Sequence, residues 1–155
     1  MQRSADSPGV LVFPPLLFGS MLAIGILLHW FQPVPLLRPL VARLFGLGLL
    51  ILSGVLARSA ERAMKRAGTN IRPDQPTLAI VTDGPFRWTR NPLYLALLCA
   101  LAGFGWLLDS AWMLLLVPVL ALLLDRLVIV REEARLLAQF GDDYRAYCRR
   151  VRRWF

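Results

Sequence analysis

The chain has 155 residues, 57% of them hydrophobic, and a mean hydropathy of +0.55. This composition excludes an ordinary soluble domain, because the apolar residues form runs long enough to cross a hydrocarbon core of about 30 Å as helices. The net charge of +8 does not indicate nucleic acid, since the basic residues are gathered in one loop and one tail beside these runs.

Two apolar runs follow a short polar N-terminus. Residues 1–9 are polar and are expected to be disordered. The uncharged run 10–31 predicts a first span that Pro14-Pro15 should bend, and it is too long for the apolar core of a cleaved signal peptide. The second predicted span, residues 36–57, completes the segment 10–57 and contains glycines that should let another helix approach closely. These are Gly46, Gly48 and Gly54.

A basic loop is predicted at residues 58–92. Its first part, residues 57–67, should continue the second helix into the cytosol, and Gly68 should end that helix. Prolines and polar residues then predict a loop at residues 69–76. Residues 77–82 form a short run rich in β-forming residues and are followed by a turn.

A hairpin of two spans is predicted at residues 93–130. Asn91-Pro92 should begin its first helix, with an N-cap followed by proline at the first helical position. The two spans are joined by Asp109-Ser110, a connection short enough for antiparallel neighbours. Asp125-Arg126 interrupts the end of the second span, and an ion pair is the simplest interpretation of these charges.

A cytosolic tail is predicted at residues 131–155. The last span should run on into the tail and end near Gly141, after which a final helix carries Tyr144, Tyr147 and Val151 on one face. The terminal segment is basic and aromatic, so it is expected to lie on anionic lipid.

The distribution of basic residues predicts the topology. Of the 18 Lys and Arg residues, seven lie between Arg58 and Arg90 and eight between Arg126 and Arg153. By the positive-inside rule the loop and the tail face the cytoplasm, and four crossings place the N-terminus there too. The predicted fold class is an all-α integral membrane protein with about four transmembrane helices, organised as one domain over residues 1–155.

The residues that carry chemistry are few. Cys99 falls in a span and Cys148 in the tail, so neither a disulfide nor a metal site is expected. The one histidine, His29, is interpreted as an interfacial anchor. The remaining candidates are two polar segments beside the cytosolic ends of the hairpin, residues 84–94 and 131–133.

These segments carry a family resemblance. The motifs, in order, are Gly84-Pro85-Phe86, Arg90-Asn91-Pro92-Leu93-Tyr94, the hairpin, Glu132-Glu133, Phe140-Gly141-Asp142-Asp143-Tyr144 and Arg150-Val151-x-Arg153-Trp154. In this order they resemble the isoprenylcysteine carboxyl methyltransferase family, to which membrane phospholipid methyltransferases are related. The similarity covers roughly the second half of the chain. The family pattern usually has histidine and glycine where this chain has Asn91 and Ala96, although many small bacterial members look similar in having asparagine, and a histidine base is therefore excluded.

The resemblance implies an S-adenosylmethionine pocket facing the cytosol, in a bacterial inner membrane, with a lipophilic acceptor or lipid entering from the bilayer. Glu132 or Glu133 can accept hydrogen bonds from the ribose, while Arg90, Asn91 and Tyr94 can hold adenine or the methionine carboxylate. The implied cofactor-binding residues are Gly84, Phe86, Arg90, Asn91, Tyr94, Leu95 and Glu132. The implied catalytic residues are Arg131, Glu132 and Glu133, and Arg131 or Arg126 can align a carboxylate acceptor.

Other interpretations stay open at the level of sequence. Asn91-Pro92 can be only a helix start, Tyr94 only an interfacial aromatic, and Glu132-Glu133 only a solvated stretch. A nicotinamide-dependent membrane reductase of similar plan is a rival enzyme, and a non-catalytic membrane partner protein is a rival of another class. Neither the acceptor (carboxylate, thiol or amine, prenylated or lipid) nor the oligomeric state follows from the sequence.

Overall fold

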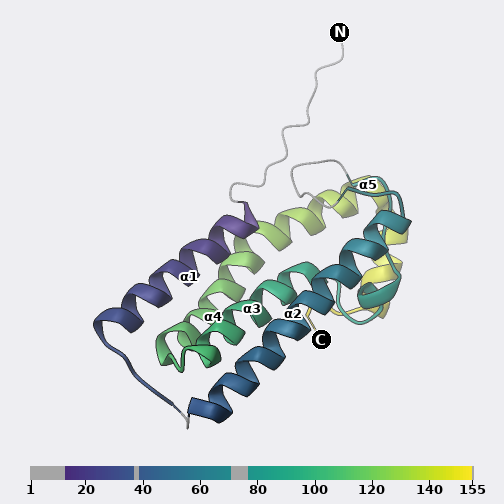
Figure 1. Cartoon of the computed structure of the whole chain (residues 1–155). Coiled ribbons are helices and arrows are strands. Elements are labelled where there is room, and N and C mark those ends of the chain that lie inside the picture. Colours follow the sequence, from purple (N-terminus) through teal and green to yellow (C-terminus); the bar gives the residue numbers. More distant parts are fainter. Residues whose placement is uncertain (1–12, 37–38, 71–76, 155) are drawn as a thin grey trace.

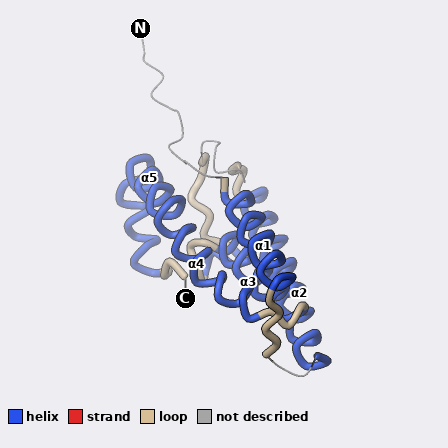
Figure 2. The backbone as a smooth tube through the Cα atoms, turned by 90° about the vertical axis from the view of Figure 1, so that its left-hand side faces the viewer, coloured by secondary structure: helices blue, strands red, loops and turns tan. Residues whose placement is uncertain are grey.

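The computed structural model describes residues 13–36, 39–70 and 77–154, and within them every regular element is helical (Figures 1 and 2). The predicted all-α class is thus confirmed. The predicted disorder at residues 1–9 and most of the predicted loop at 69–76 lie outside the described residues. The elements are α1 (Pro14–Phe31), α2 (Pro39–Arg66), the 3₁₀ turn η1 (Gly84–Arg87), α3 (Pro92–Leu107), α4 (Ala111–Leu124), the π-helical turn η2 (Asp125–Ile129) and α5 (Val130–Arg150).

Helices α1 to α4 lie side by side, with α3 packed between α2 and α4 and with α4 also packed against α1 (Figure 1). Three helical stretches are long and apolar enough to cross a membrane: α1, residues 40–66, and residues 111–150. The fourth expected span, α3, has 16 residues and a length of about 24 Å, which is shorter than the hydrocarbon core. Large apolar side chains such as Leu40, Leu44 and Ile51 point outward, so a bilayer is the solvent that suits them.

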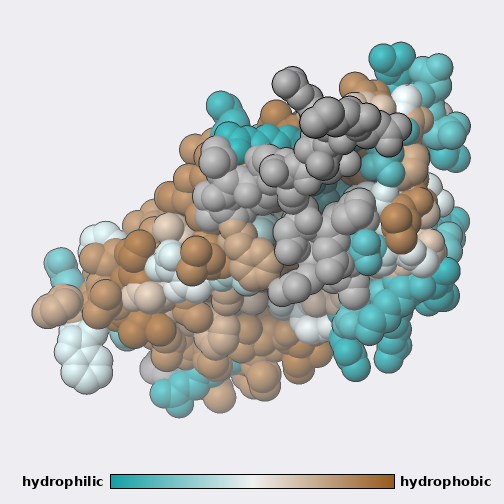
Figure 3. Space-filling model, turned by 90° about the horizontal axis from the view of Figure 1, so that it is seen from above, coloured by the Kyte–Doolittle hydropathy of each residue, from teal (hydrophilic) through white to brown (hydrophobic). Residues whose placement is uncertain are grey.

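The two short connections meet at one end of the bundle. Asp109, in the α3–α4 hairpin, accepts a hydrogen bond on Oδ1 from the Leu36 backbone N–H at 2.9 Å. Trp112 Nε1 donates to the Gln32 carbonyl at 2.7 Å. The opposite end carries the α2–α3 loop, α5 and the tail, and polar side chains gather over it (Figure 3). The basic loop and the tail therefore share one end of the bundle.

One glycine allows the close packing of α2 on α3. A Cβ atom built on Gly46 would lie 2.5 Å from the Leu107 backbone nitrogen and 2.7 Å from the Gly103 carbonyl oxygen. Gly48 and Gly54 have open space where a Cβ atom would be. The expectation of close approach is thus confirmed for Gly46 and wrong for the other two, because at about 100° per residue Gly48 points about 160° and Gly54 about 80° away from Gly46 around the helix.

Two local predictions are wrong. Pro14 and Pro15 do not bend a helix, because α1 begins at Pro14, where proline is compatible with the first turn. Residues 77–82 form no strand, since their backbone is held by side chains instead of by a neighbouring strand. The Leu78 N–H donates to Thr69 Oγ1 at 2.9 Å, and the Thr77 carbonyl accepts from Gln139 Nε2 at 2.6 Å.

Two predicted breaks are confirmed. Helix α2 ends at Arg66, and Gly68 follows in a left-handed conformation with φ 68°. Gly141, with φ 53° and ψ −120°, interrupts α5 and redirects its last part. The redirected part buries Tyr144, Tyr147 and Val151 in one cluster beneath the loop, as the periodicity of these residues predicted.

Candidate functional site

A pocket opens at the polar end of the bundle, between the beginnings of α3 and α5, the end of α2 and the loop around residues 77–81. Its volume is about 100 Å³. Its polar and aromatic lining consists of Thr69, Asn70, Thr77, Phe86, Arg90, Asn91, Tyr94, Glu132, Glu133, Arg135, Tyr144 and Tyr147. Apolar residues from α2, α3, α5 and the loop complete the wall.

Tyr94 and Glu132 join α3 to α5 across the pocket. The Tyr94 hydroxyl donates a hydrogen bond to Glu132 Oε2 at 2.8 Å. Glu132 lies past the apolar stretch that ends at Val130, yet burial raises its pKa, and the hydrogen bond from Tyr94 and the charge of Arg135 only oppose this effect. The pocket thus contains a carboxylate held by a tyrosine, and its oxygens can accept hydrogen bonds from a ligand.

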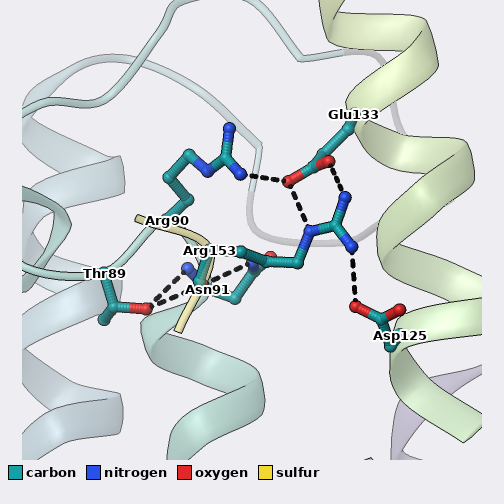
Figure 4. Close-up of polar contacts among 6 residues, drawn as sticks. All are labelled: Thr89, Arg90, Asn91, Asp125, Glu133 and Arg153. Carbon is teal, nitrogen blue, oxygen red and sulfur yellow. Dashed lines mark hydrogen bonds and ion pairs between the residues drawn. The ribbon is translucent and has the colours of Figure 1, made fainter. Parts of the chain in front are cut away.

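Glu133 is the centre of an ion-pair network at the side of the pocket (Figure 4). Arg90 Nη2 lies 3.1 Å from Glu133 Oε1, and Arg153 donates to the same carboxylate from Nε at 3.1 Å and from Nη2. The third nitrogen of Arg153, Nη1, donates to Asp125 Oδ1 at 2.9 Å. The expected Asp125–Arg126 pair is present but longer, at 3.8 Å, so Arg153 is the better partner of Asp125.

The end of the chain is fixed against the start of α3. The Arg90 N–H donates to the Arg152 carbonyl at 3.0 Å, and both the Thr89 hydroxyl and Asn91 Nδ2 donate to the Arg153 carbonyl at 3.0 Å. Asn91 occupies the predicted N-cap position of α3, but its side chain makes no capping hydrogen bond and holds the tail instead.

The expected placement of the tail on lipid does not hold for its last residues. The Arg153 side chain turns inward to two carboxylates, and Trp154 packs against the core that contains Leu124 and Ile129. The inward position of the Arg153 guanidinium is favourable because it pairs with two carboxylates, and that of the Trp154 ring is favourable because it packs on an apolar surface. The side chain of Arg152 remains exposed.

Tyrosines form the aromatic wall under the loop. Tyr147 donates from its hydroxyl to the Phe86 carbonyl at 2.7 Å, which ties η1 to the last part of α5. Burial raises the pKa of both Tyr144 and Tyr147, so these phenols stay neutral at physiological pH. Their rings give the pocket a surface on which a flat base or a cation can lie.

Arg90 offers a donor that the described residues do not use. Its Nε is buried and has no hydrogen-bond partner among them, although its Nη2 is paired with Glu133. Buried donors are normally satisfied, and Arg90 lines the pocket, so its guanidinium is a candidate partner for an acceptor on a ligand. A carboxylate is the acceptor that suits a guanidinium best.

The structure brings six of the sequence-predicted residues to the pocket: Phe86, Arg90, Asn91, Tyr94, Glu132 and Glu133. Gly84, Leu95 and Arg131 do not line it. Leu95 and Arg131 each stand next to a lining residue in a helix, and neighbours in a helix point about 100° apart. Gly84 instead turns the chain with φ 56° beside Ala63 of α2, so it shapes the loop from behind.

Sequence reasoning assigned no role in the site to Arg135, Tyr144, Tyr147 or Arg153. The sequence predicted that Tyr144 and Tyr147 lie on one face of a helix, and it placed Arg153 in a family motif. The sequence contains no signal that Arg153 would pair with Asp125 and Glu133, because Arg126, Arg131 and Arg135 lie closer to these acidic residues in the chain.

Comparison with known proteins agrees with this arrangement. The family model described as phospholipid methyltransferase matches residues 41–143, which is more than half of the chain and includes α3, α4 and both predicted polar segments. An uncharacterized protein of Haemophilus influenzae is 44% identical over 64 residues, a match that covers 40% of this chain and 98% of that protein. The chain belongs to the phospholipid methyltransferase family.

Proposed function

We propose that this membrane methyltransferase uses S-adenosylmethionine and acts on a lipophilic acceptor at the face of the membrane where the basic loop and the tail lie. By the positive-inside rule we assign this face to the cytoplasm, and we propose a bacterial inner membrane that the chain crosses four times, with both termini inside. The observation that carries the proposal is a pocket at the polar end of an apolar bundle whose lining includes a half-buried carboxylate, Glu132, and an arginine, Arg90, whose Nε has no partner among the described residues.

The residues present suit this cofactor. Glu132 would accept hydrogen bonds from ribose hydroxyls, and the Arg90 guanidinium would donate to the methionine carboxylate. The phenol rings of Tyr144 and Tyr147 would give a surface for adenine. Asn91 and Phe86 complete the wall. When bound, the cofactor supplies a methyl group on a positively charged sulfur.

The protein's own contribution is orientation and exclusion of water. The Tyr94 hydroxyl holds the Glu132 carboxylate in one position, and Arg90 is held by Glu133. The loop is fastened over the pocket by the Tyr147–Phe86 hydrogen bond, which keeps bulk water from one side. A carboxylate acceptor, which is already deprotonated, would need no base from the protein.

The acceptor is proposed to reach the pocket from the bilayer. The outward faces of α1 and α2 are apolar, so a prenyl or acyl chain would be solvated there while its head reaches the polar end. Arg131, which lies outside the cofactor pocket, and the exposed Arg126 are candidates to align a carboxylate head. A thiol or an amine head remains an alternative for the same position.

Binding of S-adenosylhomocysteine to the purified full-length protein tests the cofactor. We expect one site per chain, with loss of binding in Glu132→Gln and Tyr94→Ala. Glu61→Gln is the matched control, because Glu61 pairs with Arg58 and Lys65 on α2 away from the pocket. No binding by the wild type at millimolar ligand would refute the proposal, and a thermal shift with NADPH alone would favour the reductase.

A further inference from the structure

One guanidinium near the C-terminus contacts two carboxylates of the continuous helix that α4, η2 and α5 form (Figure 4). Arg153 donates to Asp125 at 2.9 Å with one nitrogen and to Glu133 with the other two. Its backbone carbonyl is held by Thr89 and Asn91, so the main chain and the side chain are both fixed. Such a set of contacts leaves the Arg153 fork little freedom to rotate.

The π-helical turn makes this double contact possible. Asp125 and Glu133 are eight residues apart, and in a regular α-helix their directions would differ by about 80°. The turn η2 spans Asp125–Ile129 and accommodates one additional residue. The same two side chains then differ in direction by only about 20°, as positions seven apart do in a regular helix. One side chain can therefore reach both.

Glu133 transmits this constraint to the pocket. Its carboxylate accepts from Arg153 and pairs with Arg90 Nη2 at 3.1 Å. Arg90 lines the pocket, and its buried Nε has no partner among the described residues. The order of contacts is thus Asp125 to Arg153, Arg153 to Glu133, and Glu133 to Arg90. Arg153 itself is not among the residues that line the pocket.

We infer that Arg153 is a positioning residue of the cofactor site, which fixes Glu133 and through it the ligand-binding orientation of Arg90. The inference rests on the proposed function, since it names the element that orders the same site. It also suggests a role for the π-helical turn, because this turn brings the Asp125 and Glu133 carboxylates to the same side of the helix, where one guanidinium contacts both. A misplacement of about 1 Å in a binding group is enough to cost orders of magnitude in activity.

The test measures the affinity of the full-length protein for S-adenosylhomocysteine, together with its melting temperature. We expect Arg153→Met and Glu133→Gln each to weaken binding about tenfold or more. The double variant should bind no more weakly than the weaker single variant, because both changes break one chain of contacts. Arg153→Lys should stay weakened, since one ammonium group cannot bridge both carboxylates. Arg152→Met is the matched control, with the same charge removed from an exposed neighbour.

The outcomes are distinct. If Arg153→Met lowers the melting temperature but leaves the affinity unchanged, the role of Arg153 is structural only and the inference is overturned. Additive effects of Arg153→Met and Glu133→Gln on the affinity would also overturn it. If Arg153→Met does not fold, Asp125→Asn replaces it, and unchanged affinity there would overturn the inference equally. A wild type that does not bind S-adenosylhomocysteine would instead refute the proposed function.

Discussion

The packing of α2 on α3 gives a sharp prediction, because two glycines of α2 face opposite environments. Gly46→Ala places a methyl group 2.5 Å from the Leu107 nitrogen and 2.7 Å from the Gly103 oxygen. Both of these atoms belong to the backbone, so the helices must separate by a substantial fraction of an ångström. Overpacking of this kind costs about 1–3 kcal/mol.

Gly48→Ala is the internal control. The added methyl group meets nothing within 4 Å, so the substitution should be neutral or stabilising by up to about 1 kcal/mol through helix propensity. The difference between the two variants is then about 2 kcal/mol, which corresponds to roughly 4–8 °C in melting temperature for a protein of this size. Thermal unfolding in one detergent measures it. Equal melting temperatures for the two variants would refute the proposed packing of α2 on α3.

Two further predictions concern the pocket. Burial raises the pKa of Glu132, so its carboxylate is protonated at a higher pH than that of an ordinary glutamate. S-adenosylhomocysteine should therefore bind more weakly as the pH falls through this raised pKa, measured by titration calorimetry of the wild type, and Glu61→Gln should leave this pH profile unchanged. Tyr147→Phe removes the hydrogen bond to the buried side of the Phe86 carbonyl and should destabilise the protein by about 1–2 kcal/mol, measured by thermal unfolding, with Tyr144→Phe, for which no hydroxyl bond to that carbonyl exists, as comparison.

Local patterns in the sequence were enough for much of the fold. The two-residue link Asp109-Ser110 between apolar runs indicated a hairpin, and α3 and α4 form it. Gly141 after a periodic segment indicated a break, and its positive φ provides one. The motif order also brought Arg90, Tyr94 and Glu132 to one pocket, because each stands at the polar end of a span. Features fixed within a few residues of the chain are thus predictable.

Features that depend on distant partners were not predictable. Residues 77–82 have the composition of a strand, but Thr69 and Gln139 take the hydrogen-bonding groups that a strand partner would need. The contacts of the Arg153 side chain with Asp125 and Glu133 depend on the π-helical turn, and no residue pattern at 125–129 predicts that turn. In the sequence Asn91 resembles an ordinary N-cap, and its actual hydrogen bond, from Nδ2 to the Arg153 carbonyl, depends on the position of the tail.

Methyl transfer in membranes tests the central claim most directly. Membranes containing the wild-type protein are incubated with S-adenosylmethionine labelled in its methyl group, with and without added prenylated thiols, lipids and quinone precursors. We expect label in the fraction extracted by organic solvent, at a level that Glu132→Gln reduces and Glu61→Gln does not. Label in that fraction no higher than in Glu132→Gln membranes, for every acceptor tried, would contradict a methyltransferase that acts on a lipophilic substrate.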